Sequence, residues 1–295
     1  MLQVQTARQV SAPADPERVR LAISRLRALP AFYPAVQKAQ RLLDDPLTSD
    51  SQIQRVIATD QALAARVLQL ANSAYFGLAS RVTTVSLALT LIGRNRVSTL
   101  LRRFLVEEMI HMLSGHRPAA TRIREMSVVT ATAAHSMAER MLRDDKEEIL
   151  LAGLLHNVGE LVLLSQFRED YEETLRRQQQ IPQGKAEMAI FGVESPLVGK
   201  WLLEAWGFPE FFPAVVEHWP DPWEARFPHA AVVAITIVHA ARRMAEWWLA
   251  GRGREEVGAL CSARLLSTLE VGREFLVDLY EQLPADIERV KGTLA

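Results

Sequence analysis

The chain has 295 residues, of which 49% are hydrophobic, and this predicts a globular protein with one large domain or two smaller ones. A formal net charge of -1 argues against a global electrostatic attraction to nucleic acid or to an anionic membrane. The single cysteine, Cys261, excludes an intramolecular disulfide and a cysteine-rich zinc module, and it fits a reducing compartment. The N-terminus shows no basic-then-apolar signal, and the most apolar runs are too short or are interrupted by polar residues. We therefore expect a cytoplasmic protein without a membrane span.

Helical periodicity dominates the first part of the chain, after a segment, residues 1–14, that is expected to be loose. Asp15 and Pro16 have the sequence of a helix start, and Val19, Ala22 and Ile23 would share one face of that helix. Further helices are predicted from Pro34 to about Leu43, after a cap at Ser49 or Asp50, from Asp60 to Ala74, from Val85 to Ile92, and from Arg94 to about Leu113. No period-two alternation is as strong as these patterns, so we expect an all-α fold.

A dense run of loop formers, Ser114-Gly115-His116-Arg117-Pro118, predicts a boundary between two packed helical bundles. The division is then an N-terminal bundle over residues 15–116, a second bundle over 117–250, and C-terminal helices over 251–295 that pack on the second bundle. Within the second bundle, helices are predicted at about 119–142, across 152–163 with a split at Gly159, over 168–180, and after Pro182, Ser195, Pro209 and Pro228.

The stretch from Ala152 to Leu163 is the most informative, because it places His156 and Asn157 side by side in an apolar helix. Buried polar side chains need hydrogen-bond partners, so these two must face something specific. A lone buried histidine is most simply explained by a bond to a carbonyl group. Because an amide lies next to this histidine, His156 and Asn157 together have either a structural or a functional role, and the other residues of the chain are needed to distinguish the two.

Two parts of the chain together resemble the HDOD domain, a degenerate relative of HD-type metal-dependent phosphohydrolases. The first part contains the runs Leu29-Pro30-Ala31-Phe32-Tyr33-Pro34, residues 59–75 and Leu87-Ala88-Leu89-Thr90-Leu91-Ile92-Gly93, with Gln61 where the family usually has proline. The second contains residues 152–163, 191–206 and 238–241. The resemblance covers roughly residues 17–249 and implies a second bundle that is HD-like.

HD sites hold one or two divalent metals through histidines and aspartates, and the metal generates hydroxide for attack on phosphorus. The resemblance matches the six candidate positions of the degenerate site to His135, His156, Asn157, Ser195, His218 and Arg242. Asn157 stands in place of the aspartate of the His-Asp pair, and Arg242, or Ala241 one residue earlier, stands in place of the last aspartate. A guanidinium repels a metal cation. We therefore predict no metal, no cofactor and no hydrolytic activity.

Each of these residues also has a structural explanation. His135 and His218 fit as packed histidines, Asn157 as a hydrogen-bond partner, and Ser195 as an N-cap before Pro196. Together they could instead line a polar cavity for a nucleotide or another anion, with Arg242 as the counter-charge.

Four arginines form the second candidate site, a possible patch for anions or nucleic acid at Arg94, Arg96, Arg102 and Arg103. Ion pairs with Glu107, Glu108 or other acids are the simpler explanation for the same residues.

The resemblance implies a bacterial signalling or regulatory role, and we predict a non-catalytic module of signal transduction that acts through protein–protein contacts, with partners that act in trans. The surface that it presents to a partner includes the crease between the two bundles. Two alternatives stay open, namely a residual metal-dependent phosphodiesterase or phosphohydrolase and a regulator that binds nucleic acid or a nucleotide. The oligomeric state is not predicted.

Overall fold

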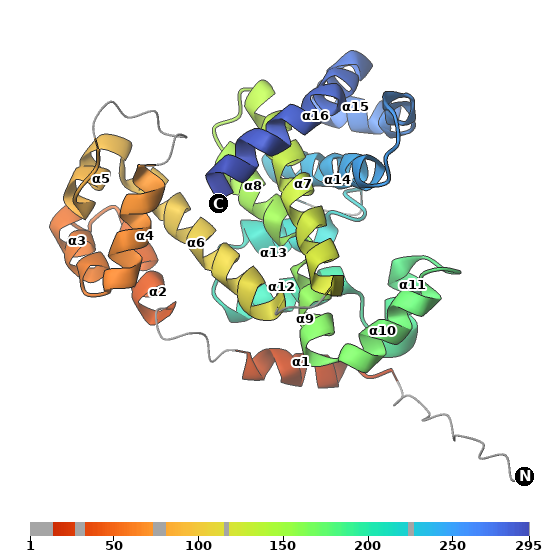
Figure 1. Cartoon of the computed structure of the whole chain (residues 1–295), viewed down its shortest axis with the longest axis horizontal. Coiled ribbons are helices and arrows are strands. Elements are labelled where there is room, and N and C mark those ends of the chain that lie inside the picture. Colours follow the sequence, from red (N-terminus) through yellow and green to blue (C-terminus); the bar gives the residue numbers. More distant parts are fainter. Residues whose placement is uncertain (1–13, 27–32, 73–80, 115–117, 224–226, 295) are drawn as a thin grey trace, which may run out of the picture.

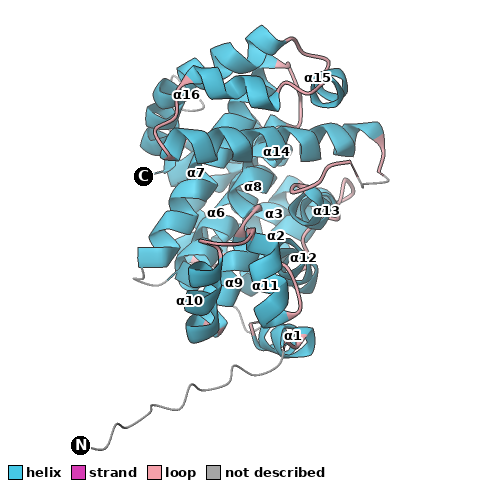
Figure 2. Cartoon of the chain, turned by 90° about the vertical axis from the view of Figure 1, so that its right-hand side faces the viewer, coloured by secondary structure: helices cyan, strands magenta, loops and turns pink. Residues whose placement is uncertain are grey.

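The computed structural model describes residues 14–26, 33–72, 81–114, 118–223 and 227–294, and in these ranges every regular element is a helix (Figure 1; Figure 2). The predicted all-α fold is confirmed. The elements are α1 (Pro16–Arg25), α2 (Tyr33–Asp44), α3 (Asp50–Ala58), α4 (Gln61–Ala71), α5 (Val85–Ile92), α6 (Arg94–Ser114), α7 (Pro118–Arg140), α8 (Lys146–Leu155), α9 (Val158–Gln166), α10 (Arg168–Arg177), α11 (Gln183–Phe191), α12 (Ser195–Ala205), α13 (Phe211–His218), α14 (His229–Leu249), the 3-10 helix η2 (Arg254–Leu260), α15 (Ala263–Leu269) and α16 (Arg273–Leu294).

The start signals in the sequence are used as capping residues. The Asp15 carboxylate accepts a hydrogen bond from the Glu17 N–H at 2.9 Å, and Pro16 occupies the first turn of α1. Ser49 precedes α3, where Gln52 Oε1 accepts from its backbone N–H at 2.9 Å. Because local capping chemistry is written in neighbouring residues, the sequence predicts these starts well.

The buried apolar side chains form two clusters. The smaller one is built from α2, α3, α4, α5 and the first half of α6, and the larger one from the second half of α6 together with α1 and the elements from α7 onward. Helix α6 passes from one to the other, since Leu105 lies in the smaller cluster and Val106 in the larger one. Figure 1 shows this helix crossing from the group of α2 to α5 into the main body.

Helix α1 packs with the larger cluster although it precedes the smaller one in the sequence. Val19 and Ile23 are buried there, and Arg18 forms an ion pair with Asp170 of α10 at 2.9 Å. The Arg18 guanidinium also lies 5.0 Å above the Phe167 ring, which adds a cation–π contact. The apolar core is therefore not divided at residue 116, because α1 and half of α6 belong with the helices of the second bundle.

Among the described residues, one stretch is long and apolar enough to cross a membrane by length and composition, contrary to the expectation that the apolar runs are too short. This stretch is Lys146–Gln166. Its most apolar 18 residues have a mean hydropathy of 1.4, and 83% of them are buried inside the protein. The stretch comprises α8 and α9, which lie in the centre of the larger cluster.

Glycines allow the central helices to approach one another closely. A Cβ atom on Gly159 would lie 1.9 Å from the Ser195 carbonyl oxygen, and one on Gly153 would lie 2.7 Å from the Ala131 Cα atom. Helix α9 thus meets α12, and α8 meets α7, with backbone against backbone. This close packing fixes the position of the His156–Asn157 turn between α8 and α9.

Candidate functional site

The chain breaks its central helix at His156 and Asn157, since α8 ends at Leu155 and α9 begins at Val158. The predicted split at Gly159 is therefore misplaced, because Gly159 lies within α9 and serves the contact with α12. His156 Nδ1 lies 2.7 Å from the Gly153 carbonyl oxygen, and the Trp219 indole N–H donates to the His156 carbonyl oxygen at 2.9 Å. A carbonyl only accepts, so Nδ1 carries the proton and Nε2 is the free, buried acceptor.

Both polar atoms of the Asn157 side chain are hydrogen-bonded to residues of α7. Its Oδ1 accepts from the Ser127 hydroxyl at 2.6 Å, and its Nδ2 donates to the Ile123 carbonyl oxygen at 3.0 Å. The amide therefore holds the start of α9 against α7. Ser127 is the residue that the sequence analysis missed, and a small hydroxyl side chain among alanines, valines and threonines gives no signal that it faces Asn157.

Arg242 of α14 lies on the other side of the turn. Its side chain is only 9% exposed, and its Nη1 atom lies 2.6 Å from Glu246 Oε1. The guanidinium is 5.5 Å from the centre of the Trp219 ring, and the His156 ring meets the same tryptophan edge-on at 5.2 Å. Burial, and then the charge of Arg242, lower the pKa of His156 to about 3, so the imidazole is neutral at physiological pH.

The other two histidines lie elsewhere. His135 is about two turns along α7 from Ser127, and its Nε2 atom is 3.2 Å from Glu147 Oε1 of α8. His218 is partly exposed, with its Nε2 atom 3.1 Å from Glu217 Oε2 and its ring 5.2 Å from the Phe227 ring. The candidate histidines therefore have separate partners.

Ser195 is the first residue of α12, and Glu194 is the N-cap, so the predicted N-cap role of Ser195 is wrong. Instead, the Ser195 backbone N–H donates to the Glu187 carboxylate at 2.7 Å, and the Gln183 amide donates to the same group at 2.9 Å. Burial, and then the charge of Glu160, raise the pKa of the Glu187 carboxyl to about 7. A carboxylate from α11 thus satisfies the helix end that Ser195 was expected to cap.

The residues around His156 do not fit a divalent metal. Within the described ranges, no group of three or more histidine, cysteine, aspartate or glutamate side chains could hold such an ion. Near the turn, one imidazole nitrogen is free, both polar atoms of Asn157 are engaged, and the nearby charge is the Arg242 guanidinium. Metal sites of this class need several anionic or imidazole ligands, and a fixed cation opposes them.

A family model described as HDOD domain matches residues 29–222. This chain belongs to the HDOD domain family. The match includes the smaller apolar cluster, the part of the larger cluster from α6 to α13, and the His156–Asn157 turn.

Solved structures with the same fold cover most of the HDOD chain. An HDOD domain protein of unknown function from Geobacter sulfurreducens is 22% identical, with a TM-score of 0.68 over 93% of this chain and 98% of that one. A Shewanella amazonensis SB2B protein named "Putative phosphohydrolase" is 19% identical, with a TM-score of 0.70 over 93% of this chain and 97% of that one. A Marinobacter aquaeolei VT8 protein named "Putative signal transduction protein" is 21% identical, with a TM-score of 0.65 over 94% of this chain and 65% of that one.

A curated relative, an uncharacterized protein of Treponema pallidum (strain Nichols), is 25% identical over 215 residues. That match covers 71% of this chain and 39% of the relative, so the HDOD chain spans well under half of that protein's length.

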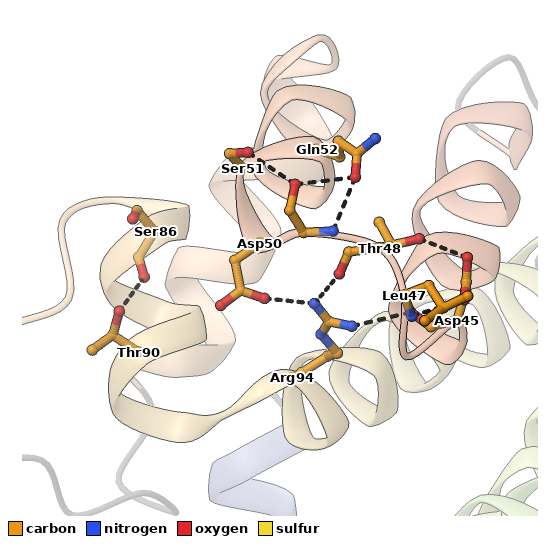
Figure 3. Close-up of polar contacts among 10 residues, drawn as sticks. Asp45, Leu47, Thr48, Asp50, Ser51, Gln52, Ser86, Thr90 and Arg94 are labelled. Carbon is orange, nitrogen blue, oxygen red and sulfur yellow. Dashed lines mark hydrogen bonds and ion pairs between the residues drawn. The ribbon is translucent and has the colours of Figure 1, made fainter.

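The four arginines of the predicted anion patch are mostly paired within the HDOD protein. Arg94 donates to the Asp45 carbonyl oxygen at 3.1 Å, to the Thr48 carbonyl oxygen, and to the Asp50 carboxylate at 2.8 Å, so it fastens the loop between α2 and α3 (Figure 3). Arg102 donates from its Nη2 atom to both oxygens of the Asp44 carboxylate, at 2.7 and 2.8 Å.

Arg103 pairs with Glu107 at 3.0 Å, which is one of the ion pairs that the sequence suggested. Arg96 is exposed. Because three of the four charges are compensated by backbone oxygens or carboxylates, these residues stabilise α6 and its neighbours rather than form one free cationic surface.

Proposed function

We propose that this HDOD protein is a bacterial regulatory module that acts through protein contacts and does not hydrolyse phosphate esters. The observation that supports this proposal is the presence of Asn157 and Arg242 at the positions where the HD-type site is expected to have aspartates. Both polar atoms of the Asn157 side chain are hydrogen-bonded, to Ser127 and to Ile123. The Arg242 guanidinium supplies positive charge where a metal site needs anionic ligands. A hydrolytic metal pair has nothing to hold it there.

The surface that we propose for a partner is the crease between the two apolar clusters. A hollow of about 230 Å³ lies there between α2, α6 and the loop from α12 to α13. Arg41 and Gln40 line one side, Phe208 and Pro209 line the other, and the Arg102–Asp44 pair is also in the lining. A rigid hollow with apolar and charged walls suits a side chain of a signalling protein that acts in trans.

The first experiment measures metal and turnover in the same preparation. The protein, purified without chelators, is analysed for bound metal and assayed with manganese on cyclic dinucleotides, nucleotides and a simple phosphate ester. We expect far less than one metal ion per chain and no turnover. In the double variant Asn157→Asp with Arg242→Asp, metal binding should rise, because two carboxylates return to the site.

The control for that variant is Asn157→Asp with Arg243→Asp, since Arg243 is the next residue of α14 and is exposed. Its metal content should stay near that of the unmodified protein. Stoichiometric metal in the unmodified protein, with phosphate-ester cleavage that is lost in His156→Ala, would overturn the proposal.

The second experiment tests the crease. A photo-crosslinking amino acid replaces Gln40 in cells, and a matched probe replaces Arg243. We expect one discrete crosslinked product from position 40, and its yield should fall about tenfold when Arg41→Glu and Phe208→Glu are added, because two lining side chains are then altered. Equal crosslinking from both positions would contradict a specific crease partner.

A further inference from the structure

A cavity of about 350 Å³ lies beside the His156–Asn157 turn, on the side of α10 and α11. Its walls come from the first turns of α7 and from α9, α10, α11 and α14, and Figure 1 shows α9, α10 and α11 next to the lower end of α7. Ile123, Met126 and Leu175 give it apolar surface. Its volume is at the lower end of the range for small-molecule pockets.

Two of the residues that line this cavity each have a buried side-chain nitrogen without an acceptor in the described part of the chain. One is Nε of Arg242, whose side chain is 9% exposed and whose Nη1 atom is already paired with Glu246. The other is the side-chain amide nitrogen of Gln178, the residue that follows α10. A buried donor without an acceptor costs free energy, and a charged one costs more, so both groups favour an acceptor that enters the cavity.

Two side-chain acceptors of the lining residues are already engaged. Glu160 Oε2 accepts from the Tyr171 hydroxyl at 3.0 Å, and Asn157 Oδ1 accepts from Ser127. The charged side chains of the lining are the guanidinium groups of Arg122 and Arg242 and the single carboxylate of Glu160. Because Glu246 lies against Arg242, the charges around the cavity nearly balance, and its complementarity to an oxyanion comes from the donors without acceptors and from the guanidinium of Arg122.

We propose that this cavity binds a small organic anion, a phosphate or carboxylate group attached to an apolar body. Arg242 Nε and the Gln178 amide hold the oxyanion, and the exposed Arg122 adds charge at the mouth of the cavity. Ile123, Met126 and Leu175 pack against the body. The bound anion is an effector that stabilises α10 and α11 against α7 and α14. This inference goes beyond the proposed function, because a small ligand in this cavity requires neither a protein partner nor the crease.

The test is calorimetric titration of the full chain with five probes: AMP, phenylacetate, adenosine, inorganic phosphate and acetate. We expect saturable binding of AMP or of phenylacetate, and whichever of them binds identifies the source of the oxyanion. Adenosine lacks the anion, and phosphate and acetate lack the body, so these three should bind at least tenfold more weakly.

Variants then place the binding site. Gln178→Leu and Arg242→Lys each remove one free donor, and each should weaken the binding tenfold or more. Arg122→Ala should weaken it severalfold, whereas Arg124→Ala, an exposed arginine of the same helix outside the cavity lining, should leave it unchanged. Arg122 is exposed, so that variant should fold normally.

Three outcomes would overturn the inference. They are no saturable binding of either organic anion up to about 10 mM, binding of adenosine as tight as that of AMP, and binding that is indifferent to Gln178→Leu and Arg122→Ala. Failure here leaves the metal and crosslinking experiments unaffected, so the two proposals can fail separately.

Discussion

At the scale of single residues, a buried side chain is defined by the atoms that it faces, and these come from distant parts of the chain. The place of Asn157 beside His156 predicts that its amide makes a hydrogen bond, and this prediction is confirmed. Its partners are the Ser127 hydroxyl and the Ile123 carbonyl, and both belong to α7. A motif shows that an amide needs partners, whereas only the packing of α7 on α9 shows which atoms supply them.

Glu187 makes the stability of the protein depend on pH. Its pKa is raised from 4.5 to about 7 by burial and by Glu160, so folding favours the protonated form. The added stability is fully present below pH 4.5 and is lost as the pH rises through 7. We expect the free energy of unfolding of the unmodified protein, relative to that of Glu187→Gln, to fall by on the order of 2 kcal/mol between pH 5 and pH 8. Urea titrations of both proteins across this range measure it.

Two features make that comparison specific. The lowered pKa of His156 acts in the opposite direction, since its contribution is present above pH 6.5 and is lost as the pH falls toward 3, and it cancels because both proteins contain His156. Glu194→Gln, at the exposed N-cap of α12, is the matched control and should show no such dependence. Parallel curves for the unmodified protein and Glu187→Gln would refute the prediction.

At the scale of elements, glycines set the distances between the central helices. In Gly159→Ala the new Cβ would lie 1.9 Å from the Ser195 carbonyl oxygen and 2.8 Å from the Gly199 nitrogen. Neither backbone atom can move without separating α9 from α12. We expect this variant to lose about 3 kcal/mol or more of stability in urea unfolding.

The control for this overpacking is Gly272→Ala, because a Cβ there meets nothing within 4 Å and the residue lies outside the helices. Its stability should change by no more than about 0.5 kcal/mol. If Gly159→Ala proved equally neutral, the backbone contact between α9 and α12 would not be as close as described.

Element boundaries show which signals a sequence carries. The bounds of α5, and the start of α1 after Asp15, follow from capping residues and periodicity, which are local. The break at His156–Asn157 does not, because Gly159 looks like the natural breaker until α12 is placed against it. The Glu187 carboxylate at the start of α12 was missed for the same reason, since α11 supplies it.

At the scale of the whole molecule, the division into bundles is where sequence reasoning is weakest. The loop formers at 114–118 suggested a boundary, yet the core changes from one cluster to the other inside α6, between Leu105 and Val106. Periodicity shows that a helix has an apolar face, but it does not show which core that face enters. The return of α1 to the larger cluster depends on contacts with α9, α10 and α12, far along the chain.

Helix α6 is shared by the two apolar cores. Because it contributes to both cores, the two clusters should unfold together in the unmodified protein. All six tryptophans belong to helices or loops of the larger part, so their fluorescence reports mainly on that part; they are Trp201, Trp206, Trp219, Trp223, Trp247 and Trp248. Circular dichroism reports on the helices of both. The two transitions in urea should therefore coincide.

Glu108→Pro should separate them. Residue 108 lies within α6, just beyond the point where the helix leaves the smaller cluster, and proline there removes a backbone hydrogen bond and clashes with the preceding turn, at a cost of about 3 kcal/mol or more. The smaller cluster then loses its continuous helical connection, so circular dichroism should begin to fall at a lower urea concentration than fluorescence changes. Glu108→Ala keeps the helix intact and should leave the transitions coincident. Separate transitions already present in the unmodified protein would show that α6 does not couple the two cores.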